Sequence, residues 1–512
     1  MAAIDINDRF RDALHLMAET GKSLFITGKA GTGKSTLLTH FCRNSKKRPI
    51  VLAPTGVAAL NVGGQTIHSF FNFQIDITLQ KVLKKKKPRN AKLYQRLKTI
   101  IIDEVSMVRA DLLDCVEAFL RKHGPKPGMP FGGVQMVFIG DLYQLPPVVT
   151  SQEREIFRDH YKTPYFFSAH ALQDFPLDII ELEKVYRQKD KRFVELLNRV
   201  RNNSVTPQDI DLLNSRYNAR EDKEFAIHLT TTNQRADTIN HERLMALKGK
   251  LYHAPADIKG DFGREYYPTS TDLSFKIGAQ IMMLNNDKDG RWVNGSLGVI
   301  KDIEQGVDGE DYVLVRLHDE KQTVEVIPHT WEVYRFSLAG NEIMAESAGT
   351  FTQYPFRLAW AVTIHKSQGK TFERVAIDLG TGTFAGGQMY VALSRCTSFE
   401  GITMKTHVKP QHIRTDPRIY AFMTGHQVRK AEEALPKNDK IALIERAIRN
   451  KALVDMVYLK GNDSKTTRTV RPLTLAEESF KGKKFLGMKA FCTLRKEERM
   501  FSVDRILEIK EG

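Results

Sequence analysis

Residues 23–36 have the sequence SLFITGKAGTGKST, in which an apolar strand runs directly into a glycine-rich loop and then into a helix. The loop satisfies the phosphate-binding pattern G-x-x-x-x-G-K-[ST] at every defined position. Its glycines let backbone N–H groups turn inward around phosphates, Lys34 reaches the β and γ oxygens, and Ser35 offers a hydroxyl to Mg²⁺. We therefore predict a nucleoside triphosphate site with Mg²⁺, contacted by Gly28, Ala30, Gly31, Thr32, Gly33, Lys34, Ser35 and Thr36.

The composition is that of a basic, soluble globular protein. A chain of 512 residues exceeds one ordinary core and predicts three or four units. With 41% hydrophobic and 27% charged residues, no apolar run of bilayer length and no signal peptide, we expect a cytoplasmic protein without a membrane partner. The formal charge of +16 favours a polyanion such as nucleic acid. Residues 401–512 carry much of this excess and are a second candidate for such a contact.

Apolar runs that alternate with helical stretches predict an α/β domain over residues 1–180. Continuous runs of this kind are typical of buried parallel strands. Residues 71–98 form a small basic insertion, in which the run KVLKKKKPR at 81–89 is either a solvated loop or a contact to phosphates. The apolar runs after the phosphate loop stand at 49–53, 99–103 and 135–140.

The rest of the chain predicts a second α/β domain and a small terminal unit. The second domain covers residues 181–425. Strand alternation with turn signals replaces the helical pattern in its middle, which predicts an inserted small β-barrel at about 250–350. Prolines and polar residues indicate a linker at 426–439, and residues 440–512 form a basic appendage of one helix and several strands.

Residues at the ends of two predicted strands are suited to triphosphate hydrolysis. Asp103 and Glu104 directly follow an apolar strand, where Asp103 can hold Mg²⁺ and Glu104 can polarise the attacking water. Gln144 follows the next strand and can sense the γ-phosphate, with a simple proline-rich turn as the alternative. Hydrolysis also needs positive charge at the γ-phosphate, for which Arg187 and Arg395 are candidates, although spacing alone allows ordinary surface arginines. The predicted catalytic set is Lys34, Asp103, Glu104, Gln144, Arg187 and Arg395.

Taken together, these segments resemble the Pif-family helicases, the Pif/RecD branch of superfamily 1B. The matching segments keep the family order over most of residues 20–405. After the phosphate loop they are APTGVAA at 53–59, GQTIHSF at 64–70, DEVSMV at 103–108, PFGG at 130–133, GD at 140–141, QLPP at 144–147, YRQ at 186–188, FVELLN at 193–198, VNG at 293–295, TIHKSQG at 363–369 and YVALSR at 390–395.

The resemblance implies two RecA-like motor domains with ATP in the cleft between them and a small barrel of the Src-homology type inserted in the second. It implies that Arg187 and Arg395 approach the γ-phosphate from the second domain, with Gly369 among the nucleotide contacts. Closure of the cleft would move the protein 5′ to 3′ along single-stranded DNA. The implied track residues, each of which can instead cap or pack, are Thr55, His68, Phe70, Thr232, Asn233, Thr363, His365 and Lys366.

One family feature is missing. Family members carry a Gln upstream of the phosphate loop that recognises adenine, whereas residues 7–13 here are NDRFRDA. The preference for ATP over other triphosphates is therefore less secure than the recognition of phosphates. Phe10 or Arg11 is a candidate to stack on the base.

Residues 440–512 resemble a WYL domain, a ligand-sensing or nucleic-acid-binding module of the Sm-like barrel type. The carrying residues include IERAI at 444–448, VYL at 457–459, RPL at 471–473 and FSVDRI at 501–506, with Val457 in place of the tryptophan that names the domain. The match rests mainly on arginines, which line an anionic-ligand pocket or form a solvated basic face. These arginines are Arg468, Arg471, Arg495 and Arg499.

The function expected from this resemblance is that of an ATP-dependent DNA helicase in replication or repair. Its expected partners are single-stranded DNA and tailed or forked duplexes, with RNA–DNA hybrids and guanine quadruplexes as further candidates, and we expect a monomer. Two alternatives remain at this point. One is a nucleotide-gated binder of nucleic acid that unwinds nothing, and the other is an RNA-directed motor.

Overall fold

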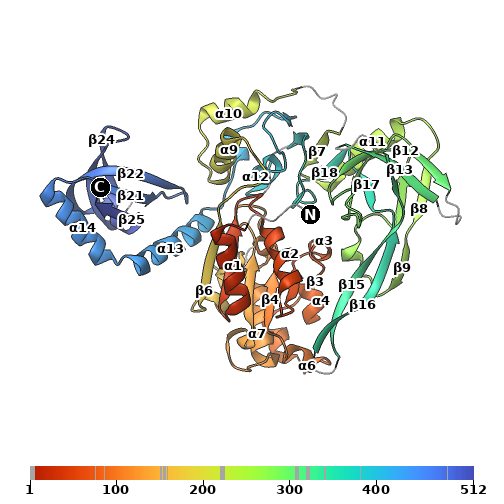
Figure 1. Cartoon of the computed structure of the whole chain (residues 1–512), viewed down its shortest axis with the longest axis horizontal. Coiled ribbons are helices and arrows are strands. Elements are labelled where there is room, and N and C mark those ends of the chain that lie inside the picture. Colours follow the sequence, from red (N-terminus) through yellow and green to blue (C-terminus); the bar gives the residue numbers. More distant parts are fainter. Residues whose placement is uncertain are drawn as a thin grey trace. The chain divides into compact units, whose positions relative to one another are not determined.

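The computed structural model describes residues 6–74, 76–85, 87–149, 153, 157, 159–219, 225–305, 311–318, 323–339, 342–380, 382–383, 385–480 and 482–511. The chain forms two compact units (Figure 1). The first contains residues 1–200 and 205–414, and the second contains residues 201–204 and 415–512. Within the described ranges, no helix has both the length and the apolar character that crossing a membrane requires.

A parallel six-stranded sheet forms the first α/β domain, with the strand order β3-β2-β4-β5-β1-β6. Every residue of β1, β2, β4 and β5 is buried, which confirms the prediction made from the apolar runs. The strands are β1 (Ser23–Gly28), β2 (Ile50–Ala53), β3 (Gln65–Thr66), β4 (Thr99–Ile102), β5 (Gln135–Ile139) and β6 (Leu177–Leu182).

Helices α1 (Asp8–Glu19) and α2 (Lys34–Asn44) share a core with this sheet. Phe10 of α1 lies in that core and is 3% exposed, so the prediction that Phe10 stacks on a nucleotide base is wrong. Its spacing with Ala13 and Met17 places all three on the apolar face of the helix. Arg11 lies at the surface, where it pairs with Asp8 at 2.9 Å.

The basic insertion is anchored to the first domain by aromatic packing. Its helices α5 (Leu79–Lys84) and α6 (Ala91–Tyr94) pack on α7 (Ala110–His123). The ring of Phe119 in α7 lies 5.3, 5.8 and 4.8 Å from the rings of Phe71, Phe73 and Tyr94, measured between centroids. The insertion therefore holds its cationic residues on a rigid base. Two further helices of this domain are α3 (Gly56–Asn61) and α4 (Ile67–Phe71).

The second α/β domain has a parallel four-stranded sheet of order β18-β7-β19-β20. Its strands come from two parts of the chain, as the sequence predicted, because the β-rich insertion separates β7 from β18. The strands are β7 (Ile227–Thr230), β18 (Ala361–Thr363), β19 (Val375–Asp378) and β20 (Ile402–Met404), and the helices are α9 (Lys191–Arg201), α10 (Pro207–Asn214), α11 (Asn233–Ala246) and α12 (Gln388–Leu393).

The insertion contains a five-stranded antiparallel sheet of order β14-β13-β12-β11-β17, with its own apolar core, and smaller sheets beside it. The strands of this sheet are β11 (Gln280–Met283), β12 (Leu297–Gln305), β13 (Asp311–Leu317), β14 (Thr323–Val326) and β17 (Phe356–Leu358). The pair β8 (Tyr252–Pro255) and β10 (Asp272–Phe275) forms a two-stranded sheet, while β9 (Asp257–Gly260) pairs with β16 of the hairpin described next.

A long hairpin of β15 (His329–Ala339) and β16 (Glu342–Gln353) extends from the insertion along the first domain (Figure 1). Trp331, Val333 and Phe351 of the hairpin share an apolar cluster with Ala53 and Ala59 of the first domain. Sequence alternation predicted strands here but not their length or this contact, which involves residues far apart in the chain.

The second unit is an antiparallel sheet of order β24-β23-β22-β21-β25 with two helices. The predicted linker at 426–439 is wrong, because α13 (Pro417–Ala434) and the start of α14 (Lys437–Asn450) occupy most of it. Pro417 stands in the first turn of α13, where proline is favoured because the missing N–H has no helical partner. The strands are β21 (Val454–Leu459), β22 (Lys465–Phe480), β23 (Lys483–Cys492), β24 (Glu497–Ser502) and β25 (Ile506–Glu511).

Candidate active site

The phosphate loop follows β1 and ends where α2 begins, as the sequence predicts. Gly31 has φ of +78°, and a Cβ built on it would lie 2.6 Å from Cβ of Arg187, so only glycine fits there. The Lys34 ammonium lies inside the curve of the loop, where it donates to the carbonyls of Gly28 at 2.7 Å and Lys29 at 3.0 Å. The positive charge of Lys34 and the N–H groups of the loop therefore lie around the same space. That space fits the phosphates of a nucleotide.

The acidic pair stands at the end of β4, beside the loop. Burial raises the pKa of Asp103 to about 6, against the opposing effects of the Glu104 backbone hydrogen bond and the Lys34 charge. Burial, and next the charge of Asp103, raise the pKa of Glu104 to about 7, while Lys34 and Arg395 act in the opposite direction. A carboxylate whose pKa lies near neutrality can accept a proton from water under ordinary conditions. Glu104 therefore has the properties of the predicted general base.

Gln368 connects this carboxylate to the predicted γ-phosphate sensor. Its amide nitrogen donates to Oε2 of Glu104 at 3.0 Å and lies 3.4 Å from Oε1 of Gln144. Gln368 belongs to the second α/β domain, whereas Glu104 and Gln144 belong to the first. The sequence analysis includes Gln368 in the family motif at 363–369 but does not predict a catalytic or binding role for it. The signal available was an amide side chain inside a glycine-terminated motif.

The two predicted arginines are held by different contacts. Arg187 adjoins Gly31 and donates from Nη1 to the carbonyl of Ser394 at 3.0 Å. Arg395 is 1% exposed, and its hydrogen bonds go to neutral acceptors: the carbonyls of Val391, Ser367 and Lys370 and the hydroxyl of Ser394.

The charge of Arg395 is therefore not neutralised by a bonded carboxylate. Burial, and next the charge of Arg187, lower the pKa of Arg395 to about 9, whereas Glu104 and Asp141 act to raise it. A buried cation without a bonded anion is costly unless an anion binds nearby. This electrostatic arrangement fits a triphosphate between the two domains.

Three of the predicted track residues line one cavity of about 1480 Å³ between the first domain, its insertion and the hairpin. These residues are Thr55, His68 and Phe70. Thr55 also caps α3 by accepting from the N–H of Ala58, so its hydroxyl is engaged. Phe70 is 5% exposed and packs against Phe71, Tyr94 and Phe336, so the prediction that its ring lies against a base is not met in this conformation.

Three others line a second cavity of about 580 Å³ in the second domain: Asn233, Thr363 and Lys366. Thr232 caps α11 by accepting from the N–H of Arg235, and it does not line that cavity. His365 adjoins Lys366 and is partly buried, which lowers its pKa. The structure thus divides the predicted track between two sites on the first unit.

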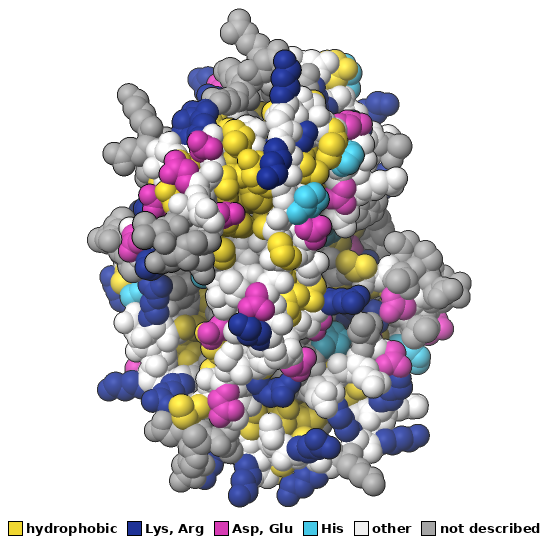
Figure 2. Space-filling model, turned by 90° about the vertical axis from the view of Figure 1, so that its right-hand side faces the viewer, with side chains coloured by type: hydrophobic (Ala, Val, Ile, Leu, Met, Phe, Trp, Pro, Cys, Tyr) yellow, Lys and Arg dark blue, Asp and Glu magenta, His cyan; other side chains and the backbone are white. Residues whose placement is uncertain are grey.

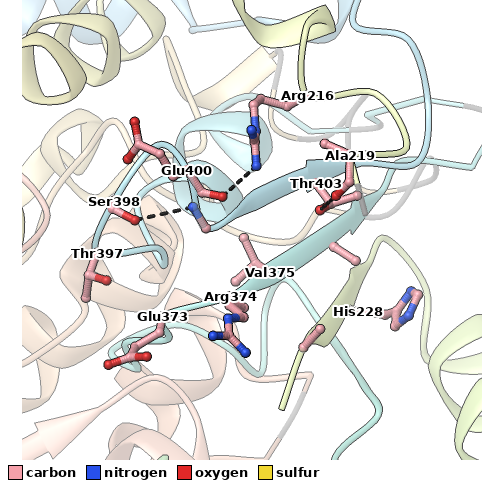
Figure 3. Close-up of a pocket in the computed structure, with 13 residues that line it drawn as sticks. Arg216, Ala219, His228, Glu373, Arg374, Val375, Thr397, Ser398, Glu400 and Thr403 are labelled. Carbon is pink, nitrogen blue, oxygen red and sulfur yellow. Dashed lines mark hydrogen bonds between the residues drawn. The ribbon is translucent and has the colours of Figure 1, made fainter. Parts of the chain in front are cut away.

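A separate cavity of about 690 Å³ lies on the second sheet, away from these residues (Figure 3). Arg216 donates there to the carbonyls of Ile402 and Glu400, and Ser398 accepts from the N–H of Gly401. The cavity adjoins the amino ends of β19 and β20, whereas α/β sheets hold ligands at the carboxyl ends of their strands. None of the predicted site residues lines it.

The segment that precedes α1, where the family's adenine-reading Gln is missing, makes contacts within the protein. Asn7 accepts the N–H of Phe10 and so begins α1, while its amide nitrogen donates to the hydroxyl of Tyr186 at 3.2 Å. Tyr186 in turn donates its backbone N–H to the carbonyl of Gly31. Both ends of the Asn7 amide are therefore engaged within the protein.

Comparison with known proteins places these features in a family. Residues 7–209 match the model of the PIF1-like helicase, and residues 439–511 match the WYL domain. The human ATP-dependent DNA helicase PIF1 is 34% identical over 435 residues, which cover 82% of this chain and 64% of that protein. The corresponding helicase of Bdellovibrio bacteriovorus is 31% identical, covering 82% of this chain and 92% of that protein.

Solved structures show the same likeness. The structure of Pif1 from Bacteroides sp in complex with ADP-AlF4 has a TM-score of 0.74 and 35% identity, and covers 83% of this chain and 98% of that one. Pif1 helicase from Candida albicans has a TM-score of 0.64 and 29% identity, and covers 83% of this chain and all of that one. The first unit therefore shares the arrangement of these motor proteins.

Proposed function

The chain belongs to the PIF1-like helicase family, and on this basis we propose that it is an ATP-dependent DNA helicase that moves 5′ to 3′ along single-stranded DNA. The observation that carries the proposal is the contact among Glu104, Gln144 and Gln368. This contact joins the predicted water-activating base and phosphate sensor of one domain to a track segment of the other. A change at the γ-phosphate can thereby reach residues 363–369, which include the predicted DNA contacts.

The residues of the loop fit ATP and Mg²⁺ in the manner expected of a phosphate-binding loop. Lys34 and the loop N–H groups would hold the phosphates, and Ser35 and Asp103 would hold Mg²⁺. When bound, the metal neutralises charge that develops on the phosphates. Among the described residues no cluster of three or more His, Cys, Asp or Glu side chains offers a separate metal site.

In the proposed reaction, the oxygen of the attacking water bonds to the γ-phosphorus as the bond to the β-phosphate oxygen breaks and ADP leaves. Glu104 accepts the proton of this water, and Gln144 senses the γ-phosphate. Arg187 and Arg395 stabilise the charge that spreads over the γ-phosphate oxygens. The two arginines come from the second domain, so full catalysis requires the domains to be close together. Hydrolysis and release would then relax this contact and permit the step along DNA.

Cationic residues of the basic insertion lie beside the proposed DNA path. Figure 2 shows Lys and Arg side chains distributed over the face that carries the inserted strands and the hairpin, and they are numerous toward its lower end. In the basic insertion Lys84, Lys87, Arg89 and Lys92 are exposed, and Arg89 also lines the larger cavity. We therefore favour a phosphate contact over a merely solvated loop for residues 81–89.

The proposed partners are single-stranded DNA and forked or tailed duplexes. Solved structures at 36% and 34% identity are described as Bacteroides Pif1 bound to ssDNA and as DNA unwinding at forked dsDNA by two coordinating Pif1 helicases. Their TM-scores are 0.61 and 0.59. RNA–DNA hybrids and guanine quadruplexes are further proposed substrates, and we propose that a monomer suffices for translocation.

The test of this proposal is steady-state ATP hydrolysis by the full chain with single-stranded DNA or RNA of the same sequence. We expect DNA to stimulate turnover strongly and RNA to stimulate it weakly. Equal stimulation by both strands would support an RNA-directed or unselective motor. An ATPase that no strand stimulates would support a nucleotide-gated binder and refute the helicase.

We further propose that the WYL domain binds nucleic-acid phosphate at one end of its sheet. Arg468 is 9% exposed, and its Nη1 has no hydrogen-bond partner among the described residues. Burial lowers the pKa of Lys460, and the next contributors are the charges of Arg468, Arg495 and Arg499, which shows that the four cations gather in one place. A buried guanidinium without a partner is costly, and an anion would remove that cost.

Arg471 does not belong to this group, which corrects the predicted four-arginine pocket. Arg468 lies on the same side of β22 as Val470, which is fully buried, whereas Arg471 is exposed. Side chains alternate between the two faces of a strand, so Arg468 and Arg471 point in opposite directions. Lys460 is instead the fourth cation of the group that contains Arg468, Arg495 and Arg499.

This difference supplies a matched pair of variants. Arg468→Gln is expected to weaken single-stranded DNA binding by the full chain, and to reduce the slope of log affinity against log salt by roughly 0.7 because one phosphate contact is lost. Arg471→Gln, on the opposite face, is expected to leave the slope unchanged. The measurement is fluorescence anisotropy over a salt series. Equal slopes for both variants and the parent chain would contradict the proposed contact.

A further inference from the structure

A tyrosine of the second domain is bonded directly to the phosphate loop. Tyr390 extends from α12 and is 4% exposed. Its hydroxyl oxygen accepts the backbone N–H of Ala30 at 2.8 Å, across 360 residues of sequence. Ala30 lies in the middle of the loop, between Lys29 and Gly31. The N–H groups of such a loop are the donors that hold phosphate oxygens.

The position of Tyr390 is fixed by its surroundings. Every residue of α12 is buried. Gly387, which precedes the helix, has φ of +78°, and a Cβ built on it would lie 2.1 Å from the carbonyl oxygen of Gln144. Only glycine permits this close approach. The helix therefore begins against the proposed phosphate sensor, and Tyr390 reaches the loop from a rigid base.

The two arginines lie close to the same hydroxyl. Tyr390 acts on the pKa of both Arg187 and Arg395, so its phenol oxygen lies near both guanidinium groups. Arg187 also adjoins Gly31, the loop residue that follows Ala30. Arg187 and Tyr390 thus lie at adjacent residues of the loop, and Arg395 lies close to Tyr390. Of these, only Tyr390 bonds to a loop N–H in the described contacts.

An N–H group has one proton and cannot make a full hydrogen bond to two acceptors. A phosphate oxygen is a stronger acceptor than a neutral phenol, because hydrogen bonds to an anion are shorter and about twice as strong. A triphosphate that enters the loop would therefore displace the phenol oxygen from Ala30. Without either acceptor the buried N–H would be left unpaired, which is unfavourable.

We propose that the Tyr390 hydroxyl is an exchangeable ligand of the phosphate loop, which competes with nucleotide phosphate for the N–H of Ala30. This role rests on the proposed function, because it assumes that the loop binds a triphosphate. Nucleotide binding then breaks one bond between the two domains, and nucleotide release restores it. Tyr390 is in this sense a positioning residue, since it acts through the loop and α12.

Competition has a definite consequence for affinity. When another group occupies the binding position, the apparent affinity for the ligand is the intrinsic affinity multiplied by the fraction of time that the position is free. Removing only the hydroxyl should therefore tighten nucleotide binding, by about threefold to tenfold for one neutral hydrogen bond. The chemical step should be unaffected, because the hydroxyl has left the loop before hydrolysis begins.

The experiment compares the full parent chain with Tyr390→Phe and with Tyr354→Phe. Tyr354 is a matched control: it is buried, and its hydroxyl also makes a long-range bond, to the carbonyl of Asp311 in the inserted barrel. Dissociation constants for ADP and for a non-hydrolysable ATP analogue are measured by calorimetry without DNA. Single-turnover hydrolysis of ATP is measured in parallel.

We expect Tyr390→Phe to bind both nucleotides threefold to tenfold more tightly, with an unchanged single-turnover rate, and Tyr354→Phe to match the parent chain. Unchanged affinity in Tyr390→Phe would overturn the proposal. Weaker binding together with a slower single turnover would also overturn it, since the hydroxyl would then contact the nucleotide itself. Tyr390→Leu, which also lacks the hydroxyl, provides the same comparison if the first variant does not fold.

Failure of the underlying function gives a different result. A parent chain that binds neither nucleotide would refute the triphosphate site itself. If the parent chain binds nucleotide and Tyr390→Phe binds it with the same affinity, only the role of Tyr390 is refuted.

Discussion

Replacement of Arg395 by lysine is expected to lower kcat for ATP hydrolysis by roughly a thousandfold, while the dissociation constant for ATP changes little. Arg395 is buried, its hydrogen bonds go to neutral acceptors, and its charge acts on Glu104. Lysine keeps the charge but loses the planar guanidinium that can contact two phosphate oxygens together. The measurement is DNA-stimulated turnover beside equilibrium binding of a non-hydrolysable analogue.

Arg216→Lys is the control for this variant. Arg216 also belongs to the second domain and donates to two backbone carbonyls, those of Ile402 and Glu400, but it lines the cavity at the amino ends of β19 and β20. We expect its kcat to stay near that of the parent chain. Equal losses of binding and turnover in Arg395→Lys would indicate that Arg395 supports the fold instead of the transition state.

The second large effect is expected from Glu104→Gln. Removal of a general base typically lowers the rate by about 10² to 10⁴-fold, and glutamine keeps the shape and an oxygen acceptor for Gln368. ATP should bind at least as well, because one negative charge near the phosphates is removed. Turnover within tenfold of the parent chain would exclude Glu104 as the base.

A further variant distinguishes the role of Glu104 from that of Gln368. Gln368→Ala removes the donor to Glu104 but leaves the carboxylate in place. We expect a smaller loss of ATPase and a larger loss of its stimulation by DNA, since Gln368 connects the carboxylate to the track segment. These two measurements are made on the same preparations.

The sequence was most informative where a local pattern determines a local structure. The buried strands could be predicted because parallel strands covered on both faces are continuously apolar, and β1, β2, β4 and β5 are buried throughout. Lys34 could be selected because it stands in the phosphate-loop motif, and Asp103 and Glu104 could be selected because they directly follow an apolar strand. The insertion of a β-rich segment was visible as a change of hydrophobic period.

Contacts between distant segments had no such signal. Tyr390 and Ala30 meet across 360 residues, and Gln368 meets Glu104 across 264, so nothing in either neighbourhood predicts the bond. The side of β22 on which Arg468 and Arg471 lie was equally hidden, because the face of a strand follows from its register with other strands. Phe10 is a different case, because the sequence did contain a signal for its position. Its spacing with Ala13 and Met17 is that of one helix face, which indicates a place in the core.

The measurement that tests the central claim most directly is strand separation by the full chain on two duplexes that differ only in the end carrying a single-stranded tail. With ATP and Mg²⁺, the duplex with a 5′ tail should be unwound, and the duplex with a 3′ tail should not. Unwinding of the 5′-tailed duplex should stop when ATP is replaced by a non-hydrolysable analogue. Unwinding of the 3′-tailed duplex alone would reverse the polarity, and DNA-stimulated hydrolysis without any unwinding would contradict the assignment of a helicase.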